Sequence, residues 1–344
     1  MAVLRRRERT SDAPPEAEHD LDAVAGHVRA AAAAALGDPP HIDDGPQAVI
    51  AGCGPHAYRL TLATDDPAWA GTLVARLSDP DVLLGEAAWI RAVGAAGFPA
   101  PDLLTGDDDH ARGLLVFRQP PGKTLAEVMV TDLPSLPRYV AAFGRLHARL
   151  HDLPPAGPRA VAGSPADDLA TRAPTGDVRA DVADELAWLA AHRPGGEAAV
   201  VCHGELNPVH VYLGVGESGG GVPVNWTRSR LAAPEYDVAA TVTAFWAVPL
   251  YVDNAVYRRM LKMARESLAS SYLAAYAEGA ARPVDDPVLA YWQAHHLCGL
   301  ACDASRRLRE GPGGPWDGGR ALAQPASALR EVRKRFWQLA AEAA

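Results

Sequence analysis

The stretch VVCHGELNPVHVYL, residues 200–213, decides the fold of this chain. Its apolar runs at 200–202 and 211–213 predict two short strands joined by a polar loop. The first strand delivers the carboxylate of Glu205 into that loop, and the imidazole of His210 follows five residues later. The stretch therefore predicts a functional loop held between two strands.

A second informative segment follows where the chain returns. Glycines within 216–221 allow a turn, and the apolar run at 222–224 predicts a further strand that leads to Asn225. We expect this hairpin to bring Asn225 close to Glu205 and His210. Phosphoryl transfer requires such a set, because a carboxylate orients or deprotonates the attacking hydroxyl and oxygen or nitrogen ligands hold magnesium on the phosphates.

These residues resemble the motifs of a known family. His203-Gly204-Glu205 with His210, then Asn225-Trp226-Thr227 and Asp237, is similar to the aminoglycoside-phosphotransferase-like (protein-kinase-like) family. The pattern most resembles the macrolide phosphotransferase branch, which has His-Gly-Asp, a histidine five residues after the aspartate, and Asp-Trp-Thr on the return strand. The resemblance is concentrated in residues 200–240. It implies nucleotide-dependent transfer of a phosphoryl group to a hydroxyl.

Two positions depart from the family pattern. The aspartate that acts as general base is Glu205 here, which keeps the charge but is one methylene longer. The metal-binding aspartate is Asn225, which removes a negative charge that magnesium prefers in its ligands. Because small displacements of a catalytic group can cost about 100-fold in rate, weak or absent catalysis is an alternative that these changes leave open.

The resemblance implies a role for each matched residue. Glu205 would be catalytic, His210 and Asn225 would bind the metal, and His203 and Asp237 would support the loop. The residues alone leave alternatives: His210 as a structural histidine, Asn225 as a hydrogen-bonding residue at a strand end, and Asp237 as a helix N-cap rather than a support for the loop.

A weaker part of the resemblance lies near the N-terminus. Arg76, on a predicted strand at 72–77, and Glu86, ten residues later, stand like the phosphate-contacting base and its helix partner. Gly52 and Gly54 would form a loop whose backbone amides approach the phosphates. An ordinary turn at these glycines, and an exposed strand arginine at residue 76, are the alternative interpretations.

Periodicity along the chain predicts an α+β architecture with two lobes, and the resemblance implies that this is the protein-kinase-like fold. A small β-rich N-terminal lobe is expected over residues 20–120 and a larger helical lobe over 121–344, after a disordered tail at 1–19. The helical lobe is indicated by apolar residues at helical spacing from 140 to 150 and by the sequence after Asp237. The elements expected in the first lobe are a helix at 21–36, strands at 48–50, 58–62, 72–77 and 113–117, and a helix at 82–94.

Composition limits the classes of partner. The 344-residue chain has a formal net charge of −9, which disfavours nucleic acid as a partner. It contains no apolar run of about 18 residues that would cross a membrane. Its four cysteines are scattered and form no disulfide framework, so we expect a reducing cytoplasm. Cys298 and Cys302, beside His295 and His296, are interpreted as buried small side chains rather than metal ligands.

The sequence thus predicts an O-phosphotransferase that uses ATP or GTP with Mg²⁺. Its acceptor would be a hydroxyl of a natural product or of a peptide serine or threonine. The alternative is a catalytically degenerate pseudokinase that binds nucleotide or serves as a scaffold for a partner enzyme. Glu205 and Asn225 are the residues that favour this alternative.

Overall fold

The computed structural model of the chain describes residues 21–49, 56–155, 176–195, 199–213, 221–252, 254–310 and 324–343, with residues 169 and 322. The predicted tail at 1–19 and the glycine loop with Gly52 and Gly54 lie outside the described residues. The predicted boundary between residues 120 and 121 stays a prediction.

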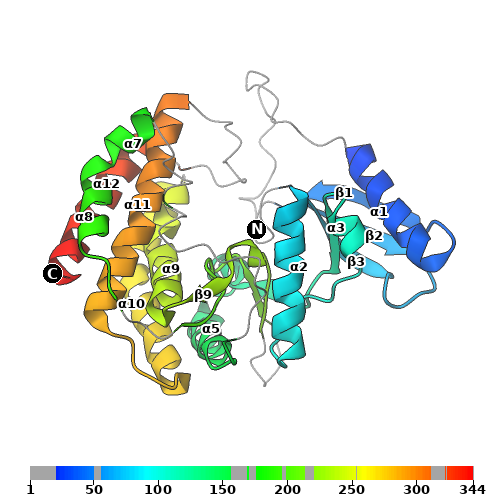
Figure 1. The fold of residues 1–344 in the computed structure, drawn as a ribbon, viewed down its shortest axis with the longest axis horizontal. Helices are drawn as coiled ribbons and strands as arrows, with labels where there is room; N and C mark the ends of the chain where they lie inside the picture. Colours follow the sequence, from blue (N-terminus) through cyan, green and yellow to red (C-terminus); the bar gives the residue numbers. More distant parts are fainter. Residues whose placement is uncertain are drawn as a thin grey trace.

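The N-terminal lobe is a four-stranded antiparallel sheet with helices on both faces (Figure 1). Side chains of the third strand alternate between the faces: Leu73 and Ala75 pack towards the first helix, whereas Val74 packs towards the second. This alternation follows from the two-residue period of a strand. The elements are α1 (Leu21–Leu36), β1 (His41–Ala48), β2 (Ala57–Ala63), β3 (Gly71–Leu77), α2 (Pro80–Ala95), α3 (Asp107–His110) and β4 (Leu114–Arg118).

The first strand differs from the prediction. A strand was expected at 48–50, but β1 runs over His41–Ala48 and pairs with β2 along the edge of the sheet. Its sequence, HIDDGPQA, is mostly exposed and contains a glycine and a proline. Because an edge strand with both faces near solvent needs no apolar alternation, periodicity did not reveal it.

The helical lobe begins after β4 and is confirmed as the larger part of the fold. The strands predicted at 200–202 and 211–213 are confirmed, and the hairpin from β7 packs Tyr212 and Val224 against the N-terminal sheet. The elements are β5 (Lys123–Thr124), α4 (Leu125–Thr131), η1 (Leu133–Ser135), α5 (Leu136–His151), α7 (Asp177–Asp181), α8 (Ala183–Ala191), β6 (Val200–Cys202), β7 (Val211–Leu213), β8 (Gly221–Pro223), η2 (Trp226–Arg228), β9 (Arg230–Ala232), α9 (Pro234–Ala247), η3 (Val248–Tyr251), α10 (Ala255–Gly279), α11 (Asp286–Glu310) and α12 (Pro325–Ala343).

Helices α5, α9 and α10 pack behind the functional loop. At the crossing of α5 and α10, Gly144 lies so close to its neighbour that an added Cβ would be 2.6 Å from the carbonyl oxygen of Tyr272. The rings of Phe143, Phe245 and Tyr272 fill the space beside this crossing. The close approach sets where the tyrosine side chains of α10 meet α5.

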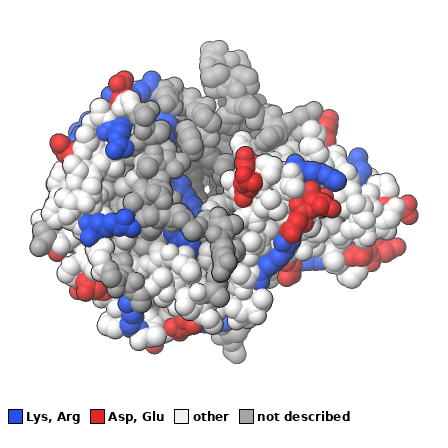
Figure 2. Space-filling model, viewed as in Figure 1, with Lys and Arg blue, Asp and Glu red and all other residues white. Residues whose placement is uncertain are grey.

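Charges are interspersed on the face of the molecule drawn in Figure 2, where Lys and Arg lie among Asp and Glu over both lobes. Among the described residues, no helix is long and apolar enough to cross a membrane.

Candidate active site

The loop from His203 to His210 is fixed at its start by backbone geometry. Gly204 adopts φ of +81°, and an added Cβ would lie 2.2 Å from the carbonyl oxygen of Arg228. Glycine is required there, because both the left-handed conformation and the close approach exclude a side chain. The hydroxyl of Ser229 donates to the carbonyl of His203 at 3.2 Å, which ties the loop to the strand that returns beside β6.

Asp237 holds the same loop from behind. Its carboxylate accepts the backbone N–H of His203 at 2.6 Å and that of Gly204 at 2.8 Å. Burial raises the pKa of Asp237, but interactions with His147 and His151 outweigh burial and keep that pKa well below its usual range. The N-cap of α9 is Ala233, so Asp237 lies inside the first turn and the interpretation as an N-cap is wrong.

His203 is buried between the loop and the hairpin. Its Nε2 donates to the carbonyl oxygen of Val224 at 3.1 Å, and its ring lies 4.8 Å from that of Trp226. Burial lowers the pKa of His203 to about 4, so the ring is neutral at physiological pH. The uncharged ring of His203 thus connects the loop to the return strand through one hydrogen bond and one ring contact.

Glu205 is the anionic group that this loop presents. Its side chain is 30% exposed, and one carboxylate oxygen lies 3.4 Å from Nε of Arg228. A partly exposed pair of this kind contributes little to stability and can exchange its arginine for a substrate group. The carboxylate is therefore accessible, as an orienting base must be.

His210 and Asn225 meet through hydrogen bonds that define the orientation of each. The Nδ1 of His210 lies 2.8 Å from the carbonyl oxygen of Glu205 and 3.1 Å from the amide nitrogen of Asn207. Because a carbonyl only accepts and lies nearer, we assign the hydrogen to Nδ1. The Nε2 of His210 then accepts from the side-chain amide of Asn225 at 3.1 Å. The amide oxygen of Asn225 accepts from Thr227 at 3.1 Å and from Arg76 at 3.2 Å.

Arg76 and Glu86 form a buried ion pair, each about 1% exposed. The interpretation of Arg76 as an exposed strand arginine is therefore wrong. Glu86 also accepts the backbone N–H of Trp226 at 3.0 Å, so this carboxylate connects the two lobes. Among the described residues, Nε of Arg76 has no hydrogen-bond partner although it is buried.

The predicted residues therefore form one continuous chain of contacts. It runs from Glu86 through Arg76, Asn225 and His210 to the backbone of Glu205. The backbone of Asn225 is left-handed, with φ of 67°, a conformation that asparagine tolerates better than most residues.

The donor set fits magnesium poorly. His210 supplies a nitrogen and Asn225 a neutral amide oxygen, whereas Mg²⁺ prefers anionic oxygen ligands in octahedral geometry. In the observed orientation the amide nitrogen of Asn225, not its oxygen, faces His210. Neither residue is anionic, so a magnesium ion would depend chiefly on nucleotide phosphates for its ligands.

Sequence reasoning missed His147 and His151, the two residues that face Asp237. Their Nε2 atoms lie 3.1 and 3.4 Å from Oδ2 of Asp237. Burial lowers the pKa of His151 to about 4. The available signal was the four-residue spacing of two histidines within the apolar stripe of α5, which places both on one helix face.

Comparison with known proteins agrees with this geometry. Residues 46–286 match the model of the phosphotransferase enzyme family. A search of curated proteins gave no match. An aminoglycoside-3'-phosphotransferase of type VIII is 20% identical with a TM-score of 0.51, and the match covers 78% of this chain and 98% of that one.

Two further solved structures share the fold. A macrolide 2'-phosphotransferase from Brachybacterium faecium is 20% identical, with a TM-score of 0.51 and coverage of 88% of this chain and 96% of that one. Amicoumacin kinase in complex with AMP-PNP and Ca²⁺ is 15% identical, with a TM-score of 0.56 and coverage of 85% and 88%. The predicted fold is therefore confirmed.

Proposed function

The chain belongs to the phosphotransferase enzyme family, and on that premise we propose that it transfers the terminal phosphoryl group of ATP or GTP to a hydroxyl. The acceptor is a small natural product or a peptide serine or threonine. The observation that supports this most is the accessible carboxylate of Glu205, on a loop that Asp237 fixes by two backbone hydrogen bonds.

In the proposed reaction Glu205 accepts a hydrogen bond from the attacking hydroxyl and takes its proton as the new oxygen–phosphorus bond forms. The bond between the terminal phosphorus and its bridging oxygen breaks, and the nucleoside diphosphate leaves. Arg76 contacts the nucleotide phosphates. Its buried Nε has no hydrogen-bond partner among the described residues, which supports this role. Any Mg²⁺ would neutralise the phosphates, with His210 and Asn225 beside it.

The names of the structural relatives support the proposed class of acceptor. Aminoglycosides, macrolides and amicoumacin are natural products, and each structural relative named above is a kinase or phosphotransferase. A panel of such compounds, with hydroxyl-bearing peptides, is the appropriate first screen. We expect no nucleic acid and no membrane as partner, and a cytoplasmic setting, from composition alone.

The test is release of nucleoside diphosphate in the presence of that panel. Glu205→Ala should lower turnover by about 10²- to 10⁴-fold, since this is the usual contribution of a positioned acid or base. Its melting temperature should match that of the wild type. Glu278→Ala, at an exposed position of α10, is the matched control and should keep full activity. Unchanged turnover in Glu205→Ala would remove Glu205 from the role of base.

A second function, that of a non-catalytic nucleotide-binding scaffold for a partner enzyme, is favoured by one observation. The Nε2 of His210 and the amide oxygen of Asn225 are both engaged within the protein, by Asn225 and by Arg76. A scaffold would bind nucleotide without releasing diphosphate under any acceptor. A binding assay run beside the turnover assay separates the two functions.

A further inference from the structure

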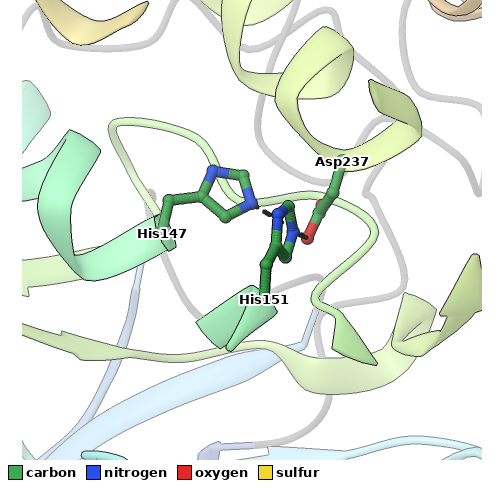
Figure 3. Close-up of side chains that lie close together, drawn as sticks. All are labelled: His147, His151 and Asp237. Carbon is green, nitrogen blue, oxygen red and sulfur yellow. Dashed lines mark hydrogen bonds and ion pairs between the residues drawn. The ribbon is translucent and has the colours of Figure 1, made fainter. Parts of the chain in front are cut away.

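Behind the functional loop, three buried side chains from two helices converge on one point (Figure 3). His147 and His151 lie one turn apart on α5, and Asp237 lies in the first turn of α9. The side chains of His147 and Asp237 are fully buried, and that of His151 is 4% exposed. The nearest ligand atoms of all three lie within 4.8 Å of one another.

The distances from the two histidines to Asp237 are close to those between the ligands of a metal ion. Nε2 of His147 is 3.1 Å, and Nε2 of His151 3.4 Å, from Oδ2 of Asp237. A tetrahedral Zn²⁺ ion with bonds of about 2.0–2.1 Å places its ligand atoms about 3.3 Å apart. The same carboxylate oxygen also accepts the backbone N–H of His203, as metal-binding carboxylates commonly do.

His147 has a polar partner at its other ring nitrogen. Its Nδ1 lies 2.5 Å from the hydroxyl of Tyr272, which can accept a hydrogen from the ring. Binding of a cation at Nε2 requires this tautomer, with the hydrogen on Nδ1.

With its hydrogen on Nδ1, His147 has a lone pair on Nε2, which lies 3.1 Å from the carboxylate of Asp237. A cation between the two groups would bind both. Among the described residues, this buried Nε2 has no hydrogen-bond partner of suitable geometry. The nitrogen is therefore oriented to bind a cation.

The outer contacts of the two histidines are alike. Nδ1 of His151 lies 2.7 Å from the hydroxyl of Tyr276, just as Nδ1 of His147 meets Tyr272. Histidines that bind metals through Nε2 usually donate Nδ1–H to such an oxygen, which fixes the tautomer and the ring. Both rings of this cluster carry that outer partner.

We propose that His147, His151 and Asp237 bind a divalent transition metal of the Zn²⁺ type. All three side chains are buried, so the ion is structural. Because Asp237 also holds the backbone of His203 and Gly204, the ion joins α5, α9 and the functional loop into one unit. This inference is independent of the proposed phosphoryl transfer.

The test is metal binding by the full chain. The protein is unfolded in the presence of a chelator and is then refolded with either Zn²⁺ or Co²⁺ as the sole added metal. We expect retention of about one equivalent of metal after gel filtration, visible absorption from tetrahedral Co²⁺, and a higher melting temperature. His147→Gln should lose these signals. The control His41→Gln, whose side chain is 81% exposed, should keep them.

A second measurement does not depend on a variant that folds. X-ray absorption of the zinc-loaded wild type should show nitrogen and oxygen ligands that include two imidazoles. Tyr272→Phe should weaken metal affinity by about 10- to 100-fold, because it removes the outer partner of His147. Folded wild type that retains no metal would overturn the proposal. Sulfur ligands, or full retention in a folded His147→Gln variant, would overturn it as well.

Discussion

The side chain of Asn225 forms hydrogen bonds with residues of both lobes. Its amide nitrogen donates to His210, and its oxygen accepts from Arg76 and Thr227. Every polar atom of this neutral side chain thus has a partner within the protein. A carboxylate at the same position would keep the contacts made by the oxygen but would lose the bond to His210.

Asn225→Asp should tighten magnesium binding. The variant would place a carboxylate oxygen opposite the lone pair on Nε2 of His210, and only a cation or a proton relieves that repulsion. Isothermal titration with magnesium and nucleotide should show a higher affinity for magnesium. Turnover should change little if other residues of the site limit the reaction. A magnesium affinity that does not change would show that residue 225 does not face the metal.

At the scale of elements, the crossing of α5 and α10 depends on Gly144. Gly144→Ala would place its Cβ 2.6 Å from the carbonyl oxygen of Tyr272 and 2.9 Å from the backbone nitrogen of Tyr276. Because backbone atoms cannot move aside cheaply, we expect a loss of about 1–3 kcal/mol in the free energy of unfolding. Denaturant titration measures this change.

Gly26→Ala in α1 is the matched control for that substitution. No atom lies within 4 Å of its added Cβ, and the residue is exposed within the helix. It should stabilise the protein by about 0.5–1 kcal/mol through lower backbone entropy in the unfolded chain. If both variants shifted the midpoint in the same direction, the close packing at Gly144 would not be the cause.

His110 in α3 makes stability depend on pH. Burial, followed by the positive charge of Arg91, lowers the pKa of His110, and contacts with Asp107 offset this only in part. The unfolded chain takes up a proton below about pH 6.5, whereas folded His110 resists it, so stability is complete above that pH and is lost as the pH falls.

The variant His110→Gln should therefore lose less stability than the wild type between pH 7 and pH 5. Glutamine can still reach Thr105, which bonds to His110 at 3.2 Å. His27→Gln, at an exposed position of α1, should follow the wild-type curve. Thermal unfolding across this pH range measures the difference, and identical slopes for all three proteins would contradict the assignment.

The elements that could be predicted from the sequence are those with strong local signals. The apolar runs at 200–202 and 211–213 mark strands. The hairpin that follows brings Asn225 to His210, which contacts the backbone of Glu205. The edge strand β1 lacks such a signal because most of its side chains are exposed. Periodicity therefore predicted the interior strands of the N-terminal sheet but not its edge strand.

The cluster behind the loop was not predictable for a different reason. His147 and His151 lie in the apolar stripe of α5, where histidines look like ordinary core residues. Their partner Asp237 is 86 residues further on from His151, and only the tertiary packing of α5 on α9 unites them. Local patterns carry no information about such a contact.

At the scale of the whole molecule, the contacts of Arg76 and Glu86 with the return strand couple the two lobes. A nucleotide that binds between the lobes should stabilise both together. At a concentration 100-fold above its dissociation constant, the expected stabilisation is about 2.7 kcal/mol. ATP or GTP should therefore raise the single melting transition, and more strongly with magnesium than without it.

Thermal shift with each nucleotide, with and without magnesium, checks this expectation. AMP is the control, because it lacks the β- and γ-phosphates of ATP. A melting temperature that responds to none of the nucleotides would count against a nucleotide site between the lobes. A rise that is independent of magnesium would contradict the expected contribution of the metal.

The left-handed backbone at residue 225 restricts the side chains that this position can hold. Glycine, asparagine and aspartate tolerate such a conformation, and most others are strained. Asparagine and aspartate codons differ by a single base, so one mutation can exchange the neutral amide for an anion without disturbing the hairpin. A lineage with this fold can therefore lose a negative charge at this position and regain it later, with no need to repair the fold in between.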